Sequence, residues 1–131
     1  MTIILKPERP ILMVDDEPIA LRGYEFVLKS EGYSNIVICE DSRDALRLIE
    51  ENDFTVVVLD LLMPYISGEE LMAHICKKNP QTPVIIITGL GEGEDLDVGI
   101  RKQAFEVIKK PVEESILLNS VKRAIEYHNT K

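Results

Sequence analysis

Five short runs of apolar, mostly β-branched residues recur along the chain, and they constrain its fold more than any other feature. Their hydrophobicity is continuous rather than alternating, which is typical of strands buried on both faces of a parallel sheet. The expected strands are Ile11 to Val14, Ile36 to Ile38, Phe54 to Leu59, Val84 to Ile87 and Phe105 to Ile108.

Apolar residues between and after these runs recur at helical spacing. The stripes are Ala20, Tyr24, Val27 and Leu28, then Ala45, Leu48 and Ile49, then Leu71, Met72 and Ile75, and finally Leu117, Val121, Ala124 and Ile125. Boundary signals agree, since Pro18 suits a first helical turn, Ser67 with Glu70 forms a capping box, and Gly32 follows the first helix. The alternation predicts an α/β fold, an open, doubly wound sheet of five parallel strands with right-handed crossovers.

The fourth helical segment, residues 89 to 102, is the weakest of the five. It holds four of the seven glycines and a cluster of acids, and each interior glycine costs a helix roughly 1 kcal/mol. We expect this helix to be short, late-starting or mobile.

The 131 residues suffice for one domain. We expect residues 1–9 to be an N-terminal flank, 10–127 the domain, and 128–131 a tail that could link to an effector domain. The composition is 45% hydrophobic and 29% charged, without a run near the roughly 20 apolar residues of a membrane span. The start does not resemble a signal peptide, so the sequence indicates a cytoplasmic protein without membrane contact.

Charge and cysteine usage exclude further classes of function. A net charge of −8 repels nucleic-acid phosphates, so we expect no direct binding of DNA or RNA by this domain. Cys39 and Cys76 lie in apolar surroundings outside any Cys-x-x-Cys pattern, which indicates neither a disulfide framework nor a zinc site. His74 and His128 are isolated and are expected on the surface.

The ends of the expected strands carry the chemistry, because ligands of open parallel sheets bind outside the carboxyl ends of the strands. The first strand ends in Asp15, Asp16 and Glu17, the third in Asp60, the fourth in Thr88, and the fifth in Lys109, Lys110 and Pro111. We therefore expect carboxylates, a hydroxyl and an ammonium at one edge of the sheet.

Three clustered carboxylates repel one another unless they take up protons or bind a cation. Oxygen ligands with room for water favour Mg²⁺. The lysine and threonine then suit an anion beside the ion, and a phosphoryl group is the natural candidate. Asp60 is the best candidate for a nucleophile that forms an acyl phosphate, since Leu59, Leu61 and Leu62 limit water around it.

Simpler interpretations exist for each residue. Asp15 and Asp16 suit helix capping ahead of Pro18, which would be an additional role for one carboxylate. Asp60 could be a turn residue before Pro64, although the three residues after it are apolar. Thr88 could be a β-branched strand end.

The ordered set Asp15-Asp16, Asp60-Leu61-Leu62-Met63-Pro64 with Gly68, Thr88-Gly89 and Lys110-Pro111 resembles the receiver domain of two-component response regulators, which has a flavodoxin-like (βα)5 fold. The resemblance spans residues 10 to about 127. It implies Asp60 as phosphoacceptor, Mg²⁺ held by Asp15, Asp16, Asp60 and the backbone carbonyl of Leu62, and phosphoryl contacts from Thr88 and Lys110. It also favours a cis Lys110-Pro111 peptide bond.

By this resemblance the phosphoryl donor is a sensor histidine kinase or a phosphotransfer protein. The domain is a signalling phosphoacceptor rather than an enzyme, and it catalyses its own phosphorylation and dephosphorylation. Its output face would comprise the fourth helix, the strand Phe105 to Ile108 and the last helix. That face would act on a partner, on an attached effector domain or in a homodimer.

One position departs from the family pattern, and two others bear on hydrolysis. The family usually has Tyr or Phe three residues before the lysine, where this chain has Val107, and a valine cannot perform a ring switch. Phe105 shares the strand face of Val107 by parity but is a poor substitute. The apolar residues Leu62 and Leu90, each two positions after a site residue, predict slow hydrolysis of the acyl phosphate.

Two other classes of function stay open at this point. A metal-dependent phosphohydrolase with an aspartyl nucleophile would usually place a second acid where this chain has Leu62. A flavodoxin-like cofactor-binding domain would need a Ser/Thr/Gly-rich phosphate loop after the first strand, where this chain has the acidic sequence DDEP.

Overall fold

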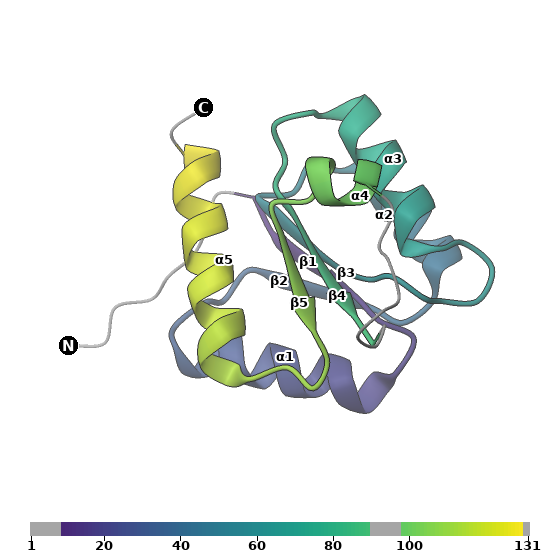
Figure 1. Cartoon of the computed structure of the whole chain (residues 1–131). Helices are drawn as coiled ribbons and strands as arrows, with labels where there is room; N and C mark the ends of the chain where they lie inside the picture. Colours follow the sequence, from purple (N-terminus) through teal and green to yellow (C-terminus); the bar gives the residue numbers. More distant parts are fainter. Residues whose placement is uncertain (1–8, 90–97, 130–131) are drawn as a thin grey trace.

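The computed structural model describes residues 9–89 and 98–129 of the chain. Strands and helices alternate along it, as the sequence predicts, and Figure 1 shows the helices packed around one central sheet. The elements are β1 (Ile11–Val14), α1 (Pro18–Ser30), β2 (Ile36–Cys39), α2 (Ser42–Glu51), β3 (Val56–Asp60), α3 (Gly68–Lys78), β4 (Val84–Thr88), α4 (Val98–Gln103), β5 (Glu106–Lys109) and α5 (Glu114–Asn129).

All five strands are parallel, and their order in the sheet is β2-β1-β3-β4-β5. The chain therefore reverses its direction of winding at β1 and β3, and this order is the flavodoxin-like variant of the doubly wound fold. The register places Val14 beside Leu59 and Asp60 beside Ile87. The residues after β1 and at the end of β3 consequently meet at the carboxyl edge of the sheet, at the point where the topology switches.

Successive residues of each strand point into two separate cores, because side chains alternate across a sheet. On one face, Leu12, Val57 and Ile86 pack with helices α2 and α3 and with Ile100 of α4. On the other face, Met13, Val58 and Ile85 pack with α1 and α5. Burial on both faces explains why β1, β3 and β4 have continuous apolar sequences.

Every residue of the expected helix stripes is buried or half-buried. Leu71, Met72 and Ile75 are all buried, as are Leu117, Val121 and Ala124. Leu21 of α1 is also buried, although the expected stripe of that helix omits it. Helix α1 begins at Pro18, and Ser67 caps α3 by accepting a hydrogen bond from the amide of Glu70 at 3.1 Å.

Strand β1 has the expected bounds, and those of the other four strands differ from the expected ones by one or two residues. The largest consequence is at β5, which begins at Glu106 rather than at Phe105. Phe105 packs with the α1 and α5 core, where its ring lies 5.6 Å from that of Tyr127, whereas Val107 packs with the opposite core. The inference from parity that these two residues share a face is therefore wrong, because alternation holds only within a strand and Phe105 precedes it.

Further expectations concern helix α4, the two cysteines, His74 and membrane-spanning helices. Helix α4 spans Val98–Gln103, whereas residues 90–97 of the glycine-rich segment, Leu90 among them, lie outside the described residues. Cys39 is buried and Cys76 is half-buried, both as free thiols, and His74 is exposed. Within residues 9–89 and 98–129, no helix combines the length and apolar character needed to cross a membrane.

Candidate functional site: an acidic cluster at the carboxyl edge of the sheet

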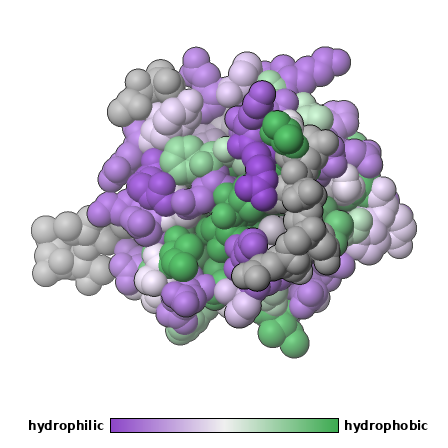
Figure 2. All heavy atoms as spheres, viewed as in Figure 1, coloured by the Kyte–Doolittle hydropathy of each residue, from purple (hydrophilic) through white to green (hydrophobic). Residues whose placement is uncertain are grey.

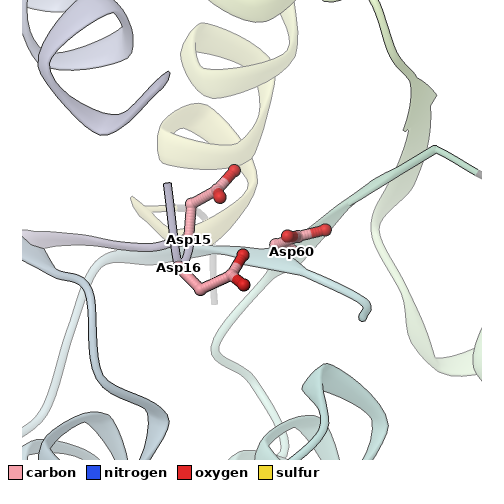
Figure 3. Close-up of side chains that lie close together, drawn as sticks. All are labelled: Asp15, Asp16 and Asp60. Carbon is pink, nitrogen blue, oxygen red and sulfur yellow. The ribbon is translucent and has the colours of Figure 1, made fainter. Parts of the chain in front are cut away.

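Three aspartates lie together at the carboxyl edge of the sheet. Asp15 and Asp16 follow β1 and Asp60 ends β3, and each offers a carboxylate oxygen within 4.8 Å of the other two (Figure 3). Asp15 is 1% exposed and Asp60 is 5% exposed, whereas Asp16 is exposed. The carboxylates of Asp15 and Asp60 are thus shielded from water, whereas that of Asp16 is accessible to it.

The two oxygens of Asp15 have different surroundings. Its Oδ1 accepts a hydrogen bond from the backbone amide of Glu17 at 2.9 Å, which orders the turn before α1. Its Oδ2 is buried and accepts no hydrogen bond, and it lies 3.4 Å from the Nζ of Lys110. One oxygen of this carboxylate therefore orders the turn and the other faces the site. The interpretation of Asp15 and Asp16 as helix caps is wrong, because α1 has Glu17 at its N-cap position and no side-chain cap hydrogen bond.

Lys110 reaches the cluster from the chain that follows β5. Its Nζ lies 3.5 Å from Asp60 Oδ2, so one ammonium pairs with both buried carboxylates. The backbone amide of Lys110 donates to the carbonyl of Thr88 at 2.8 Å, and this bond ties the end of β4 to the same corner. The Lys110-Pro111 peptide bond is cis, as the family resemblance implies.

The electrostatics of the cluster follow from burial and from the excess of negative charge. Burial, together with the charge of Asp15, raises the pKa of Asp60 from 3.8 to about 6, against the opposing effect of Lys110. Burial alone would lower the pKa of Lys110, but Asp15 and Asp60 together raise it above its usual value. Burial and the charge of Asp15 also raise the pKa of Tyr24, a phenol on α1 near this corner.

The cluster has the donor chemistry of a site for a hard divalent cation. It offers carboxylate oxygens from three residues, and hard cations such as Mg²⁺ prefer oxygen ligands. The buried Oδ2 of Asp15 lacks a hydrogen-bond donor, and burial together with the charge of Asp15 keeps the pKa of Asp60 raised despite Lys110. A second cation would give the Oδ2 of Asp15 a partner and would stabilise the ionised form of Asp60, so these residues fit Mg²⁺.

Gly68 fixes the base of the loop between β3 and α3. Its amide donates to the carbonyl of Leu61 at 2.9 Å, and a Cβ at this position would collide with the backbone carbonyl oxygen of Asp60 and approach Leu61 Cα to 2.9 Å. A side chain here would displace the backbone that carries Asp60. Glycine at position 68 is therefore a requirement of the close approach between α3 and the end of β3.

The tip of the same loop contacts the first turn of α2, a contact that sequence reasoning missed. The Ser42 hydroxyl donates to the carbonyl of Pro64 at 2.7 Å and accepts from the amide of Ile66 at 3.0 Å. Between those residues, Tyr65 has a positive φ of 71°, and the guanidinium of Arg43 lies 3.8 Å from the centre of its ring. A tyrosine at positive φ leaves no pattern in the sequence that would have revealed it.

The remaining expected site residues have distinct positions. Thr88 ends β4 with 1% exposure, and Leu62 follows Asp60 with 61% exposure. Lys109, the neighbour of Lys110, is exposed. Val107 is half-buried on β5 opposite Ile86 and occupies the place of the family's usual aromatic residue. The structure therefore brings Asp15, Asp16, Asp60 and Lys110 together, with Thr88 joined to that corner through its backbone.

A doubly wound sheet with an acidic cluster and a bridging lysine at its switch point defines a flavodoxin-like domain with a candidate site at the carboxyl edge of its sheet. Residues 11–122 match the response regulator receiver domain family. The chain belongs to this family, as the receiver domain of two-component response regulators. The match supports neither the phosphohydrolase nor the flavodoxin-like cofactor-binding alternative.

Individual relatives agree with this assignment. The transcriptional regulatory protein GlrR of Escherichia coli is 34% identical over 116 residues, which are 88% of this chain and 26% of that protein. The uncharacterized transcriptional regulatory protein YkoG of Bacillus subtilis is 32% identical over 121 residues, 92% of this chain and 53% of that protein. The chain thus spans about a quarter to a half of these relatives.

Solved receiver structures share the fold. A response regulator receiver domain protein from Clostridium thermocellum superposes with a TM-score of 0.83 at 31% identity, covering 93% of this chain and 98% of that one. A CheY-like receiver domain protein from Methanospirillum hungatei gives a TM-score of 0.83 at 28% identity, with 93% and 97% of the two chains covered. The predicted fold class is confirmed.

Proposed function

We propose that Asp60 accepts a phosphoryl group and that the modified domain controls an output partner. One observation carries this proposal: a carboxylate with 5% exposure lies 3.5 Å from the Lys110 ammonium, within a cluster that also offers oxygens of Asp15 and Asp16. Such a site binds a cation and an anion together, which is the requirement of phosphoryl transfer.

The proposed transfer is a single displacement at phosphorus. A carboxylate oxygen of Asp60 attacks the phosphorus of a phosphohistidine on a sensor kinase or phosphotransfer protein. The new O–P bond forms as the N–P bond breaks, and the electron pair returns to the imidazole nitrogen. Lys110 offsets the charge of the phosphoryl oxygens, and the Thr88 hydroxyl donates a hydrogen bond to one of them.

The residues that would hold Mg²⁺ are Asp15, Asp16, Asp60 and the backbone carbonyl of Leu62. When bound, the ion supplies positive charge that offsets repulsion between the carboxylates and the incoming phosphoryl group. Asp15 is kept in place by its bond from the amide of Glu17. In this way the domain catalyses its own phosphorylation. At the same site it also catalyses dephosphorylation, in which water attacks the phosphorus, the O–P bond to Asp60 breaks, and the carboxylate and inorganic phosphate are released.

The output face comprises α4, β5 and α5. Strand β5 is an edge strand of the sheet, and Figure 2 shows apolar surface over this region, between α4 and α5, with polar side chains around it. An exposed apolar region with a polar rim suits contact with another protein. We propose that it contacts an attached effector domain, a partner or a second copy, and that a domain spanning residues 10–127 works in the cytoplasm without touching nucleic acid.

The test is phosphorylation by a small donor, acetyl phosphate, followed by mass spectrometry of the intact protein. Wild type should gain one phosphoryl group when Mg²⁺ is present, and should lose this ability in EDTA. Asp60→Asn should abolish uptake and still fold. Asp53→Asn is the matched control, because Asp53 is a half-exposed acid that pairs with Arg9 and Lys78 instead. Uptake that survives Asp60→Asn would overturn the assignment.

A further inference from the structure

The loop after Asp60 adopts a backbone conformation that its own sequence disfavours. Tyr65 lies in the left-handed region with φ 71°, where large L side chains are strained. The amide of Ile66 donates to the carbonyl of Pro64 at 2.9 Å, which closes a γ-turn around Tyr65, and γ-turns with positive φ are rare and strained. The ring is 71% exposed, so burial in a core does not hold it there.

Ser42 supports this turn from both sides. Its hydroxyl bonds to Pro64 and Ile66, the two residues that flank Tyr65, at 2.7 and 3.0 Å. Ser42 is 2% exposed, so water does not compete readily for these bonds. One buried hydroxyl therefore satisfies the polar groups of a strained turn more than twenty residues away along the chain.

Arg43 holds the side chain of Tyr65. Its guanidinium lies 3.8 Å from the ring centre, a geometry for cation–π attraction. Asp41 fixes the guanidinium in turn, because its carboxylate accepts hydrogen bonds from Arg43 Nε at 3.1 Å and from an Nη at 2.8 Å. We call Asp41, Ser42 and Arg43 together the α2 clamp.

We propose that the α2 clamp positions the loop carrying the Leu62 carbonyl, and thereby sets how well the site binds Mg²⁺ and accepts a phosphoryl group. The base of the loop is fixed by the bond from Gly68 to Leu61, and the clamp fixes its tip. Release of the tip lets Tyr65 relax from positive φ, and the backbone from Leu62 onward shifts with it. Ser42 and Arg43 are positioning residues, and this inference rests on the proposed function.

The test compares the Mg²⁺ concentration that gives half-maximal phosphorylation by acetyl phosphate. Ser42→Ala should raise that concentration by about five- to tenfold, as expected for the loss of a net hydrogen bond. The rate at saturating Mg²⁺ should change less, since no reacting group is removed. A purely structural role would lower the amount of folded protein without shifting the Mg²⁺ dependence.

Tyr65→Gly provides the decisive second variant. Glycine adopts positive φ without strain, so the turn needs no clamp in this background. Ser42→Ala and Arg43→Ala should each shift the Mg²⁺ dependence in the wild-type loop and have little effect when combined with Tyr65→Gly. Equal effects of Ser42→Ala in both backgrounds would contradict the strain argument and overturn the proposal.

Ser67→Ala is the matched control for lost stability. It removes the cap of α3, the bond from the amide of Glu70 at 3.1 Å, and leaves the contacts of the α2 clamp in place. It should leave the Mg²⁺ dependence unchanged. A shift as large as that of Ser42→Ala would mean that general destabilisation explains both variants, and the clamp would be refuted.

Hydrogen exchange separates failure of the clamp from failure of the proposed function. The amide of Ile66 should exchange faster in Ser42→Ala than in wild type, whereas the amide of Gly68 should change less. Unchanged exchange at Ile66 refutes the clamp whatever the phosphorylation result. Absence of phosphoryl uptake by wild type refutes the proposed function, and with it the proposed effect of the α2 clamp on phosphorylation.

Discussion

The Nζ of Lys110 lies 3.5 Å from Asp60 Oδ2 and 3.4 Å from Asp15 Oδ2, and so joins the chain after β5 to the ends of β3 and β1. One ammonium faces three carboxylates once Asp16 is counted. The site therefore carries surplus negative charge in a partly desolvated place. Its response to pH, metal and mutation follows from that imbalance.

Asp60→Asn should stabilise the metal-free protein at pH 7 to 8. The pKa of Asp60 is raised from 3.8 to about 6 by burial and by Asp15, so the folded protein binds this proton more tightly than the unfolded chain does. The stabilisation from that proton is complete below about pH 4 and is lost as the pH rises through about 6. Ionised Asp60 thus costs about 1–3 kcal/mol at pH 7 to 8, and asparagine removes that cost.

Urea denaturation in EDTA between pH 4 and pH 8 measures this effect. The difference in unfolding free energy between Asp60→Asn and wild type should grow from near zero to its full value across that range. Added Mg²⁺ should stabilise wild type and act much less on the variant. A difference that does not change with pH would mean that the Asp60 carboxylate does not titrate as described.

Lys110→Ala should destabilise the protein at pH 7 by about 1–3 kcal/mol, because it leaves two buried carboxylates without their cation. It should also raise the pKa of Asp60 further and suppress phosphoryl uptake. Carboxyl NMR shifts and urea denaturation measure these changes. Lys109→Ala, at the exposed neighbouring position, should stay within about 0.5 kcal/mol of wild type. Equal effects of the two variants would show that the ion pairs contribute little.

Gly68→Ala should destabilise the domain by about 2–4 kcal/mol, because its Cβ would meet the backbone of Asp60 and Leu61 rather than a side chain that could move. Phosphoryl uptake should fall with it. Gly23→Ala is the matched control within α1, where a Cβ meets no atom within 4 Å. That variant should be stabilised by about 0.5–1 kcal/mol. Thermal unfolding of both proteins distinguishes backbone contact from a general intolerance of side chains.

Leu62→Asn should shorten the lifetime of the phosphorylated state. Leu62 lies two residues after Asp60 and is 61% exposed, and an apolar side chain at this position gives an attacking water no hydrogen-bond partner. A polar side chain supplies one, so loss of phosphate should accelerate several-fold. Intact-mass measurements after removal of the donor follow the decay. Loss of phosphate from wild type within seconds in the presence of Mg²⁺ would contradict the expectation of slow hydrolysis.

Much of the site could be predicted because strand ends are local features. A run such as Val56 to Leu59 followed by Asp60 shows where a buried strand stops, and parallel strands bring such stops to one edge. The exact bounds were harder, since hydrophobicity does not show where ladder pairing begins. Phe105 illustrates this, because one residue of error at the start of β5 assigned its ring to the wrong face.

The sequence alone determined the sheet, its two-sided burial and the set of groups at its edge, because these depend on periodicity and on which residue ends each strand. Only the tertiary structure decided how charge is shared among Asp15, Asp60 and Lys110, because a pKa depends on burial and on distances of a few ångströms. It alone also showed that Ser42 and Arg43 hold the loop at Tyr65. That contact joins residues that are distant in sequence, and neither segment has a periodic pattern from which the contact could be predicted.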